Sequence, residues 1–310
     1  MVAVSFEAWA PSTAALYGSG LTTYHLFCDE KGVPERQRAP ASSELIEAFV
    51  SALAGAYAAS TVANYFAAVR AWHVLHRLDW CLNKDQISNL LRAASKLAPE
   101  SSKRPAREPY TVKILADIFK VLNRNDPFDA AVRFCATSLL FGIARSGELT
   151  TKSMKTFDPA INIPARNIRR ERMEASGTEV VILHIPKTKA DQVNGEDIRF
   201  SSQPSLDIDP VEEMENHLRI NAPAPDEHLF AYSLIRPKSR PSRVPLSYQR
   251  FSSRMKEAAE EAGIRSLLGH AFRIGEPSMN NIGRSSTASA YSAVKHIECE
   301  SELSKFRALA

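Results

Sequence analysis

The sequence predicts a mainly helical protein, in which an N-terminal helical bundle precedes an α+β domain with a small antiparallel sheet. Three observations predict this class. Apolar residues recur at helical spacing through most of residues 1–98. Residues 99–109 combine proline, serine and charge without periodicity, which is typical of a linker. Residues 178–185 form a β-branched run that indicates a strand, and the turn signal Asn194-Gly195 follows it.

The N-terminal bundle is expected to hold about four helices. The first covers residues 13–28, where apolar side chains recur at helical spacing. Ser42 opens the second helix and Ser60 opens the third. Asn83 and Gln86 have the spacing of a capping box in front of the fourth.

The second domain is expected to begin with helices and to contain one strand pair. Asp126 and Pro127 combine an N-cap residue with proline at the first helical position, and the helix that they open runs to Gly142. The strand at residues 178–185 is expected to pair with residues 197–200 through the turn between them. The interruption by a sheet makes this domain α+β.

The length of 310 residues is enough for two domains of roughly 100–200 residues each. We place a helical domain at residues 1–99, a basic linker at residues 100–109 and the second domain at residues 110–310. No apolar run approaches the ~20 residues that a membrane helix needs, and the N-terminus lacks the basic start of a signal peptide. The four cysteines form no CxxC pair, so neither a zinc site nor a disulfide framework is indicated. We therefore expect an intracellular protein.

The net charge is +4, and the basic surplus lies in the middle third of the chain. Residues 101–200 carry 17 Lys and Arg against 12 Asp and Glu, whereas the other two thirds are nearly balanced. Such clusters suit phosphate backbones, and a solvated face is the alternative interpretation. The residues that gather the surplus are Lys103, Arg104, Arg107, Arg166, Arg169, Arg170 and Arg172.

Two short motifs far apart in the chain contain candidate phosphate ligands. In Leu139–Leu149, Arg145 follows an apolar helix and lies near the start of the next one, where backbone N–H groups favour anions. An arginine that simply pairs with Glu148 at a helix junction is the alternative. In the second motif, His270 and Arg273 are three residues apart and would share a helical face. Its alternative is a core histidine beside a solvent-exposed arginine.

These residue types are the ones that metal-free cleavage of a phosphodiester requires. Negative charge develops on the two non-bridging oxygens, and the planar fork of arginine donates two parallel hydrogen bonds to them. A lysine or histidine can protonate the leaving oxygen, and a tyrosine can act as the nucleophile. Lys187 and Lys189 follow the predicted strand and could reach such a phosphate, although hairpin lysines are common.

The set Arg145, Lys187 or Lys189, His270 and Arg273, in this order, resembles the tyrosine recombinase (phage integrase) family. The segment GIARSGEL resembles the first-arginine box of the family, and GHAFRIG resembles its His-x-x-Arg box. The segments WAPSTAALYGSGL, RAPASSELI and STVANY are similar to a fungal group of integrase-like proteins of mobile elements. The resemblance covers roughly residues 8–275.

The resemblance implies a SAM-like core-binding domain and a catalytic domain that close around duplex DNA in the nucleus, with several protomers assembled on it. No metal, cofactor, membrane or small-molecule substrate is implied. The family roles would make Arg145 and Arg273 the phosphate clamp and Lys189, or else Lys187, the general acid. His270 would assist proton transfer. Four basic residues are expected to contact DNA: Lys103, Arg104, Arg107 and Lys187.

The chain departs from the family pattern after Gly275. The spacer to Gly283-Arg284 is shorter than in the family by about one helix, and no tryptophan follows. Tyr291 is the nearest candidate nucleophile, but the family position falls near Ser292, and one residue rotates a helical side chain by ~100°. An ordinary half-exposed tyrosine is the alternative, so a catalytically inactive DNA-binding remnant of a recombinase stands beside the enzyme. A helical interaction module with no DNA role is the third reading.

Overall fold

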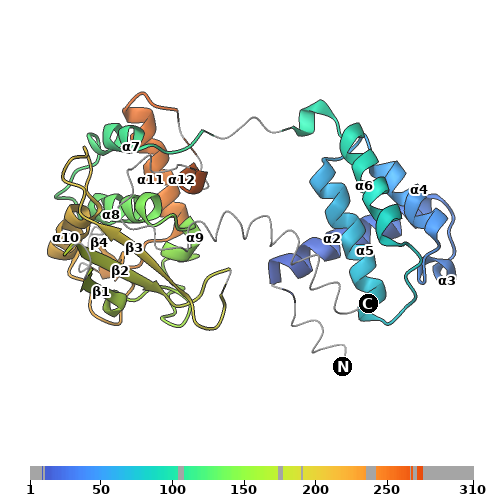
Figure 1. Ribbon diagram of the computed structural model, residues 1–310, viewed down its shortest axis with the longest axis horizontal. Coiled ribbons are helices and arrows are strands. Elements are labelled where there is room, and N and C mark those ends of the chain that lie inside the picture. The colour runs from blue at the N-terminus through green and yellow to red at the C-terminus, as the bar shows by residue number, and fades with distance from the viewer. Residues whose placement is uncertain are drawn as a thin grey trace. The chain divides into compact units, whose positions relative to one another are not determined.

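The chain forms two compact units, Met1–Ala106 and Arg107–Ala310, each with its own core. The computed structural model describes residue 9 and residues 11–103, 108–173, 177–189, 191–234, 242–265, 267 and 271–274. Figure 1 shows that these residues are mainly helical and that the sheets lie in the second unit. The fold class predicted from the sequence is confirmed. In the described part of the chain, no helix is long and apolar enough to cross a membrane.

The first unit is a bundle of helices whose starts follow local capping signals. The Ser42 hydroxyl accepts a hydrogen bond from the backbone N–H of Leu45, and Asn83 and Gln86 form the complete capping box. Both predicted helix starts are confirmed, because each cap satisfies backbone donors that the helix itself leaves unpaired. The elements are α2 (Pro11–Glu30), α3 (Glu35–Arg38), α4 (Ser43–Leu53), α5 (Ala59–Leu75), α6 (Lys84–Leu97) and η1 (Glu100–Ser102).

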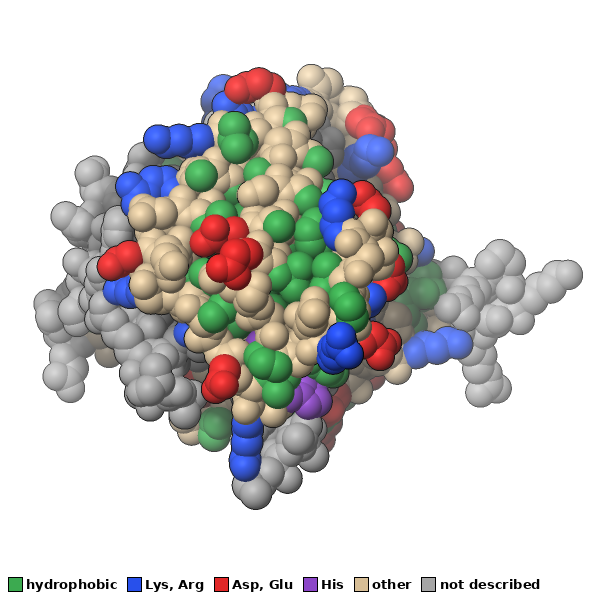
Figure 2. Space-filling view, turned by 90° about the vertical axis from the view of Figure 1, so that its right-hand side faces the viewer, with side chains coloured by type: hydrophobic (Ala, Val, Ile, Leu, Met, Phe, Trp, Pro, Cys, Tyr) green, Lys and Arg blue, Asp and Glu red, His purple; other side chains and the backbone are tan. Residues whose placement is uncertain are grey.

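The core of the first unit is apolar and packs α4 against α5. Ile46 and Phe49 from α4 and Val62 from α5 are fully buried. The backbones of α2 and α5 approach closely at Gly20, where an added Cβ would lie 2.7 Å from the Cβ of Ala68. Figure 2 shows apolar side chains on the face of this unit turned to the viewer, with charged side chains mostly around them.

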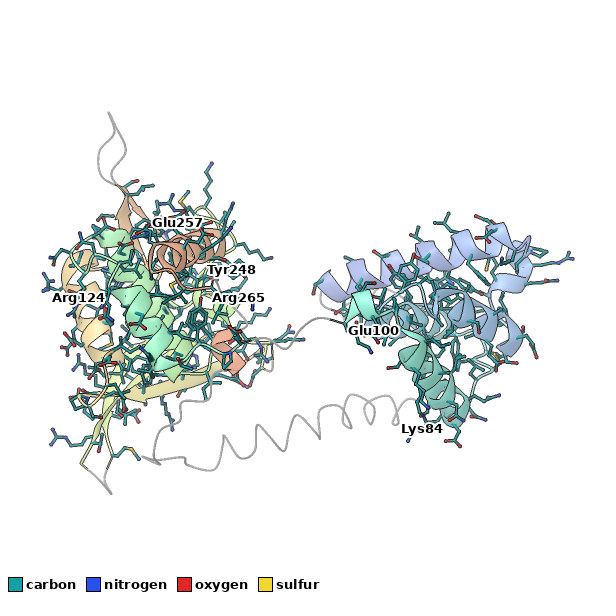
Figure 3. All side chains as sticks on the ribbon, turned by 90° about the horizontal axis from the view of Figure 1, so that it is seen from above. Lys84, Glu100, Arg124, Tyr248, Glu257 and Arg265 are labelled. Atoms are coloured by element: carbon teal, nitrogen blue, oxygen red, sulfur yellow. The ribbon has the colours of Figure 1, made fainter. Side chains whose placement is uncertain are left out.

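The second unit is built around α8 (Pro127–Phe141), which is buried from Asp129 to Leu140. The Asp126 side chain caps it and Pro127 occupies its first turn, as predicted. Figure 3 shows the side chains of this unit, where the labelled Arg124 pairs with Glu212 at 2.8 Å. The other helices are α7 (Val112–Phe119), α9 (Ser146–Leu149), η2 (Ala165–Asn167), α10 (Pro210–Asn221), α11 (Tyr248–Glu261) and α12 (Ala271–Ile274).

A three-stranded antiparallel sheet packs beside α8 in the order β1 (Ile168–Arg172), β2 (Glu179–Ile185) and β3 (Glu196–Ser201). The predicted pair is β2 and β3, with Val181 opposite Phe200. The sequence did not predict β1, because its Ile-Arg-Arg-Glu-Arg run lacks apolar alternation. A two-stranded hairpin, β4 (Tyr232–Leu234) with β5 (Ser242–Val244), was also not predicted.

One buried and one partly buried ion pair join α8 to its neighbours. Arg133 makes a bidentate pair with Glu213 of α10, at 2.8 Å from Nε and 2.6 Å from Nη2, and also donates to the carbonyl of Phe119. Asp129 receives two hydrogen bonds from Arg254 of α11, at 2.7 and 3.1 Å. Each partner supplies the charge and the hydrogen bonds that a buried ion needs.

Candidate functional site

Arg145 lies between the end of α8 and the start of α9. After Gly142, the backbone takes a left-handed conformation at Ile143 (φ 53°) and turns the chain into α9. Arg145 is the residue that precedes this helix, and its backbone N–H donates to Oε2 of Glu148 at 2.8 Å. Its Nη1 donates to Oε1 of the same carboxylate at 2.7 Å.

The Glu148 carboxylate therefore holds both the backbone and the guanidinium of Arg145. The side chain of Glu148 is 12% exposed and that of Arg145 is 33% exposed. Among the described residues, Nε and Nη2 of Arg145 make no hydrogen bond, so the exposed edge of the guanidinium can donate hydrogen bonds to an anion. The pairing considered as the alternative interpretation is present, and the same pairing orients the arginine.

Arg273 belongs by its backbone to α12, which is fixed to the core of the second unit. Phe272 stacks on Tyr110 with ring centroids 4.0 Å apart, and the Tyr110 N–H donates to the carbonyl of Ala271. Both α12 and α9 contact α8, and Figure 1 draws them near one end of that helix. The side chain of Arg273 lies outside the described residues. Four other predicted site residues lie entirely outside the described residues: His270, Tyr291, Arg104 and Arg107.

Lys187 and Lys189 lie in the connection between β2 and β3, and both are exposed. Between them Thr188 is buried, and it exchanges hydrogen bonds with Asp191 across the turn. Gly195 closes the connection at φ +71°, where an added Cβ would lie 2.0 Å from the carbonyl oxygen of Ile185. The buried threonine thus anchors a connection whose two lysines point to solvent.

Carboxylates compensate much of the predicted basic cluster. Arg166 pairs with Asp226, and Arg169 pairs with both Glu171 and Asp197. These pairs weaken the interpretation that the arginines form a free phosphate-binding surface, because each guanidinium already has a neighbouring acid. Arg170 likewise pairs with Glu179 and Glu215. Lys103 is exposed and pairs with Glu100 at 2.5 Å.

Two histidines in the core of the second unit are held neutral. Burial lowers the pKa of His217 to about 4, and burial lowers the pKa of His228 to about 3. His217 contacts the Leu229 carbonyl through Nε2 and the Asn221 amide through Nδ1. In the described residues, His, Cys, Asp and Glu side chains form no group that could hold a metal ion.

Sequence reasoning did not find a cavity of about 450 Å³ at the start of α11. Ser247, Arg250 and Arg254 line it together with Phe128 of α8. The sequence carries a cap signal at Ser247 but no signal for a cavity, because its other walls come from residues more than 90 positions earlier in the chain.

Comparison with known proteins found low similarity to solved recombinase structures, whereas no family model and no curated protein sequence matches the chain. An FLP recombinase–Holliday junction complex has a TM-score of 0.35 at 13% identity, covering 53% of this chain and 37% of that chain. A Flpe–Holliday junction complex gives 0.35 at 11% identity, covering 87% and 74%. A lambda integrase dimer bound to a COC′ core site gives 0.39 at 13% identity, covering 86% and 78%. The chain thus spans 37% of the first of these chains, and values of this size assign no family.

Proposed function

We propose that this chain is a DNA-binding protein of the tyrosine recombinase type, which cleaves and rejoins DNA strands through a 3′-phosphotyrosine. The observation that carries the proposal is the arrangement at the start of α9. There the arginine of the first box is oriented by Glu148 and keeps an exposed edge. A guanidinium held in one plane can bind two phosphate oxygens without further ordering of its side chain.

In this mechanism Arg145 and Arg273 neutralise the two non-bridging oxygens of the scissile phosphate. The Tyr291 oxygen forms the new bond to phosphorus as the bond to the 5′ oxygen breaks. Lys189, or else Lys187, gives its proton to that leaving oxygen, and His270 assists proton transfer by taking the phenolic proton of Tyr291. The phosphotyrosyl bond keeps the energy of the broken bond, so rejoining requires no ATP.

Binding to duplex DNA is the first test. Fluorescence anisotropy of a labelled duplex at several salt concentrations should give an affinity that falls as salt rises, because phosphate contacts release counterions. Arg145→Ala should weaken binding and reduce the salt slope by about 1. The exposed arginine Arg219 on α10 offers a matched control, and Arg219→Ala should leave the slope unchanged. Equal loss in both variants would contradict a specific role for Arg145.

Cleavage is the second test. A suicide duplex, which loses a short strand after cleavage, should trap a covalent adduct with the intact protein, and Tyr291→Phe should abolish it. DNA binding without any adduct supports the second candidate, an inactive DNA-binding remnant. The departure of the sequence after Gly275 favours that candidate. Absence of binding as well would leave the helical interaction module, whose function should survive Arg145→Ala with Arg273→Ala.

The proposal includes four broader expectations from the sequence. The helical first unit would act as the core-binding domain, and Lys103, Arg104 and Arg107 would follow the DNA backbone. Several protomers would assemble on DNA, and the protein would act in the nucleus. Size-exclusion chromatography with and without duplex DNA tests the assembly, since a protein that stays monomeric on DNA would contradict it.

A further inference from the structure

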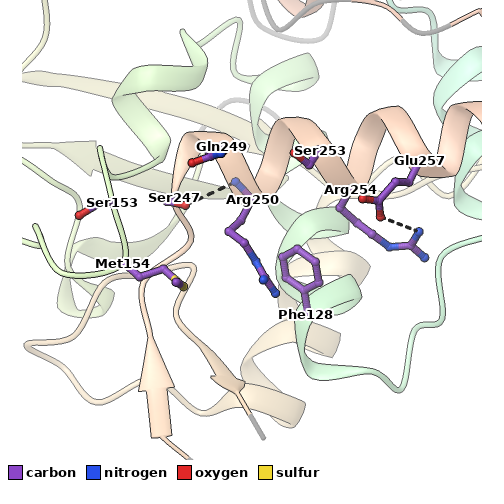
Figure 4. Close-up of a pocket in the computed structure, with 9 residues that line it drawn as sticks. All are labelled: Phe128, Ser153, Met154, Ser247, Gln249, Arg250, Ser253, Arg254 and Glu257. Atoms are coloured by element: carbon purple, nitrogen blue, oxygen red, sulfur yellow. Dashed lines mark hydrogen bonds and ion pairs between the residues drawn. The ribbon is translucent and has the colours of Figure 1, made fainter. Parts of the chain in front are cut away.

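The cavity at the start of α11 is bounded by three separate segments of the second unit. Gln249, Arg250 and Ser253 contribute from α11, and Phe128 contributes from the start of α8. The segment after α9 adds Ser153 and Met154. Figure 4 shows Arg250 directed from α11 into the space between Met154 and Phe128.

Backbone hydrogen bonds on one side and an ion pair on the other hold these walls in place. The backbone N–H of Tyr248 donates to the Thr151 carbonyl, and the Thr151 N–H donates to the Leu246 carbonyl, which fixes the segment after α9 against α11. On the other side, the Asp129–Arg254 ion pair fixes α11 to α8 beside Phe128. The cavity is therefore formed before any ligand enters, as is usual for small-molecule sites.

The two arginines of this cavity differ in their partners. The guanidinium of Arg254 is occupied by Asp129 and also lies near Glu257 and Glu261. Arg250 stacks on the ring of Phe128, with 4.6 Å from its Cζ to the ring centroid. Its Nε is buried and has no hydrogen-bond partner among the residues that the structure describes.

The residues that the structure describes give the Arg250 guanidinium no carboxylate partner, and Figure 4 shows this guanidinium directed into the cavity. An anion in the cavity can accept hydrogen bonds from the terminal Nη groups of Arg250 and from the hydroxyl of Ser253, which lines the same space. The cavity volume of about 450 Å³ exceeds what a single phosphate or carboxylate fills. The ring of Phe128 and the thioether of Met154 provide apolar surface for the rest of the ligand.

We propose that this cavity binds a nucleotide, with its phosphate on Arg250 and its sugar or base against Phe128 and Met154. The nucleotide is either free or part of a nucleic-acid strand, and both sources present the same phosphate chemistry. The inference does not rest on the proposed strand-cleavage function, because none of the residues predicted for that function lines the cavity.

Isothermal titration calorimetry of the full chain tests the proposal with deoxyadenosine monophosphate as the probe. Binding should be detected, and deoxyadenosine without its phosphate should bind at least tenfold more weakly. Arg250→Gln should weaken nucleotide binding at least tenfold. Lys256→Gln removes the same charge from an exposed position of the same helix outside the cavity, so it should stay within twofold.

A second variant, at an exposed position, distinguishes loss of binding from loss of folding. Ser253 is exposed, so Ser253→Glu should fold while placing a like charge at the phosphate position, and it should also weaken binding at least tenfold. The melting temperature of each variant checks its fold. No binding of the monophosphate, equal binding by Arg250→Gln, or tighter binding of poly-glutamate than of the nucleotide would overturn the proposal.

The length of the ligand separates the two sources. A ten-residue oligothymidylate that binds at least tenfold more tightly than the monophosphate, with the same sensitivity to Arg250→Gln, would assign the cavity to a nucleic-acid strand. Equal affinity would assign it to a free nucleotide, and both results support the proposal. If duplex binding and covalent adducts are absent while the monophosphate still binds, the strand-cleavage function alone is wrong.

Discussion

The cores of the two units are stabilised in different ways. In the described part of the first unit, His73 is the one polar side chain that is fully buried, and it is neutral between the Ala41 N–H and the Val69 carbonyl. The second unit contains one buried ion pair, Arg133–Glu213, and one partly buried ion pair, Asp129–Arg254. The first core therefore depends on apolar packing, whereas the second also depends on charges that must stay paired.

This difference is linked to the candidate sites. Each ion pair fixes a helix to α8, and α8 leads directly to Arg145 while its first turn supplies Phe128 to the cavity. Directional hydrogen bonds position neighbouring helices more narrowly than apolar contacts do, so we infer that they set the geometry of the second unit. A stability comparison is practical because all three tryptophans, Trp9, Trp72 and Trp80, belong to the first unit.

The largest effect is expected from breaking the more deeply buried pair. Glu213→Ala leaves Arg133 as an uncompensated buried charge and should lower the free energy of unfolding of the second unit by about 3–5 kcal/mol. Hydrogen exchange of peptides from α8 measures this loss. Tryptophan fluorescence should show that the stability of the first unit is unchanged. A loss under ~1 kcal/mol in the second unit would contradict the claim that its core depends on paired charges.

A cavity created by substitution in the core of the first unit should destabilise the first unit and leave the second unit unchanged. Ile46 is fully buried, and Ile46→Ala should destabilise the first unit by about 2–4 kcal/mol through lost burial and an unfilled cavity. Urea denaturation followed by tryptophan fluorescence measures it. Protection of α8 against hydrogen exchange should not change, and a parallel loss there would mean that the units unfold together.

Acid should act on the second unit through His217. Its pKa in the folded chain is about 4, below the ~6.5 of an unfolded histidine, so both states are uncharged above pH 6.5. Between pH 6.5 and 4, His217 binds a proton in the unfolded chain but not in the folded chain. The stability of the second unit should therefore fall with pH in this window, by at most ~1.4 kcal/mol per pH unit for this proton.

The control for the acid effect is His217→Asn, which removes the titrating ring. Denaturation at pH 7 and pH 5 should give a smaller difference for this variant than for the unchanged chain. An identical pH dependence would assign the acid sensitivity to other groups, among which His228 also has a lowered pKa.

The smallest effect is expected from a helix cap in the first unit. Asn83→Ala removes the acceptor for the N–H groups of Asp85 and Gln86 and should cost about 1 kcal/mol. Tryptophan-monitored denaturation measures it. Asn83→Asp keeps the acceptor and serves as the matched change, so equal losses in the two variants would contradict the role of the cap.

The sequence predicted the features that depend on neighbouring residues. The Asn83–Gln86 capping box and the Asp126–Pro127 helix start use hydrogen bonds within one turn, so their spacing is visible in the chain. The β2–β3 pairing was predictable because the turn signal Asn194-Gly195 lies between a β-branched run and a second short strand. The pairing of Arg145 with Glu148, weighed as an alternative, is also local.

Tertiary structure decided what depends on residues far apart. The strand β1 exists because β2 offers it a hydrogen-bonding edge, although its arginine-rich sequence has no strand pattern. Arg133 and Glu213 are 80 residues apart, and Phe128 and Arg250 are still further apart, so no local spacing indicates either contact. Short-range hydrogen bonds determine where helices start, whereas charge pairing and cavities arise only when packing removes water from groups that the chain keeps distant.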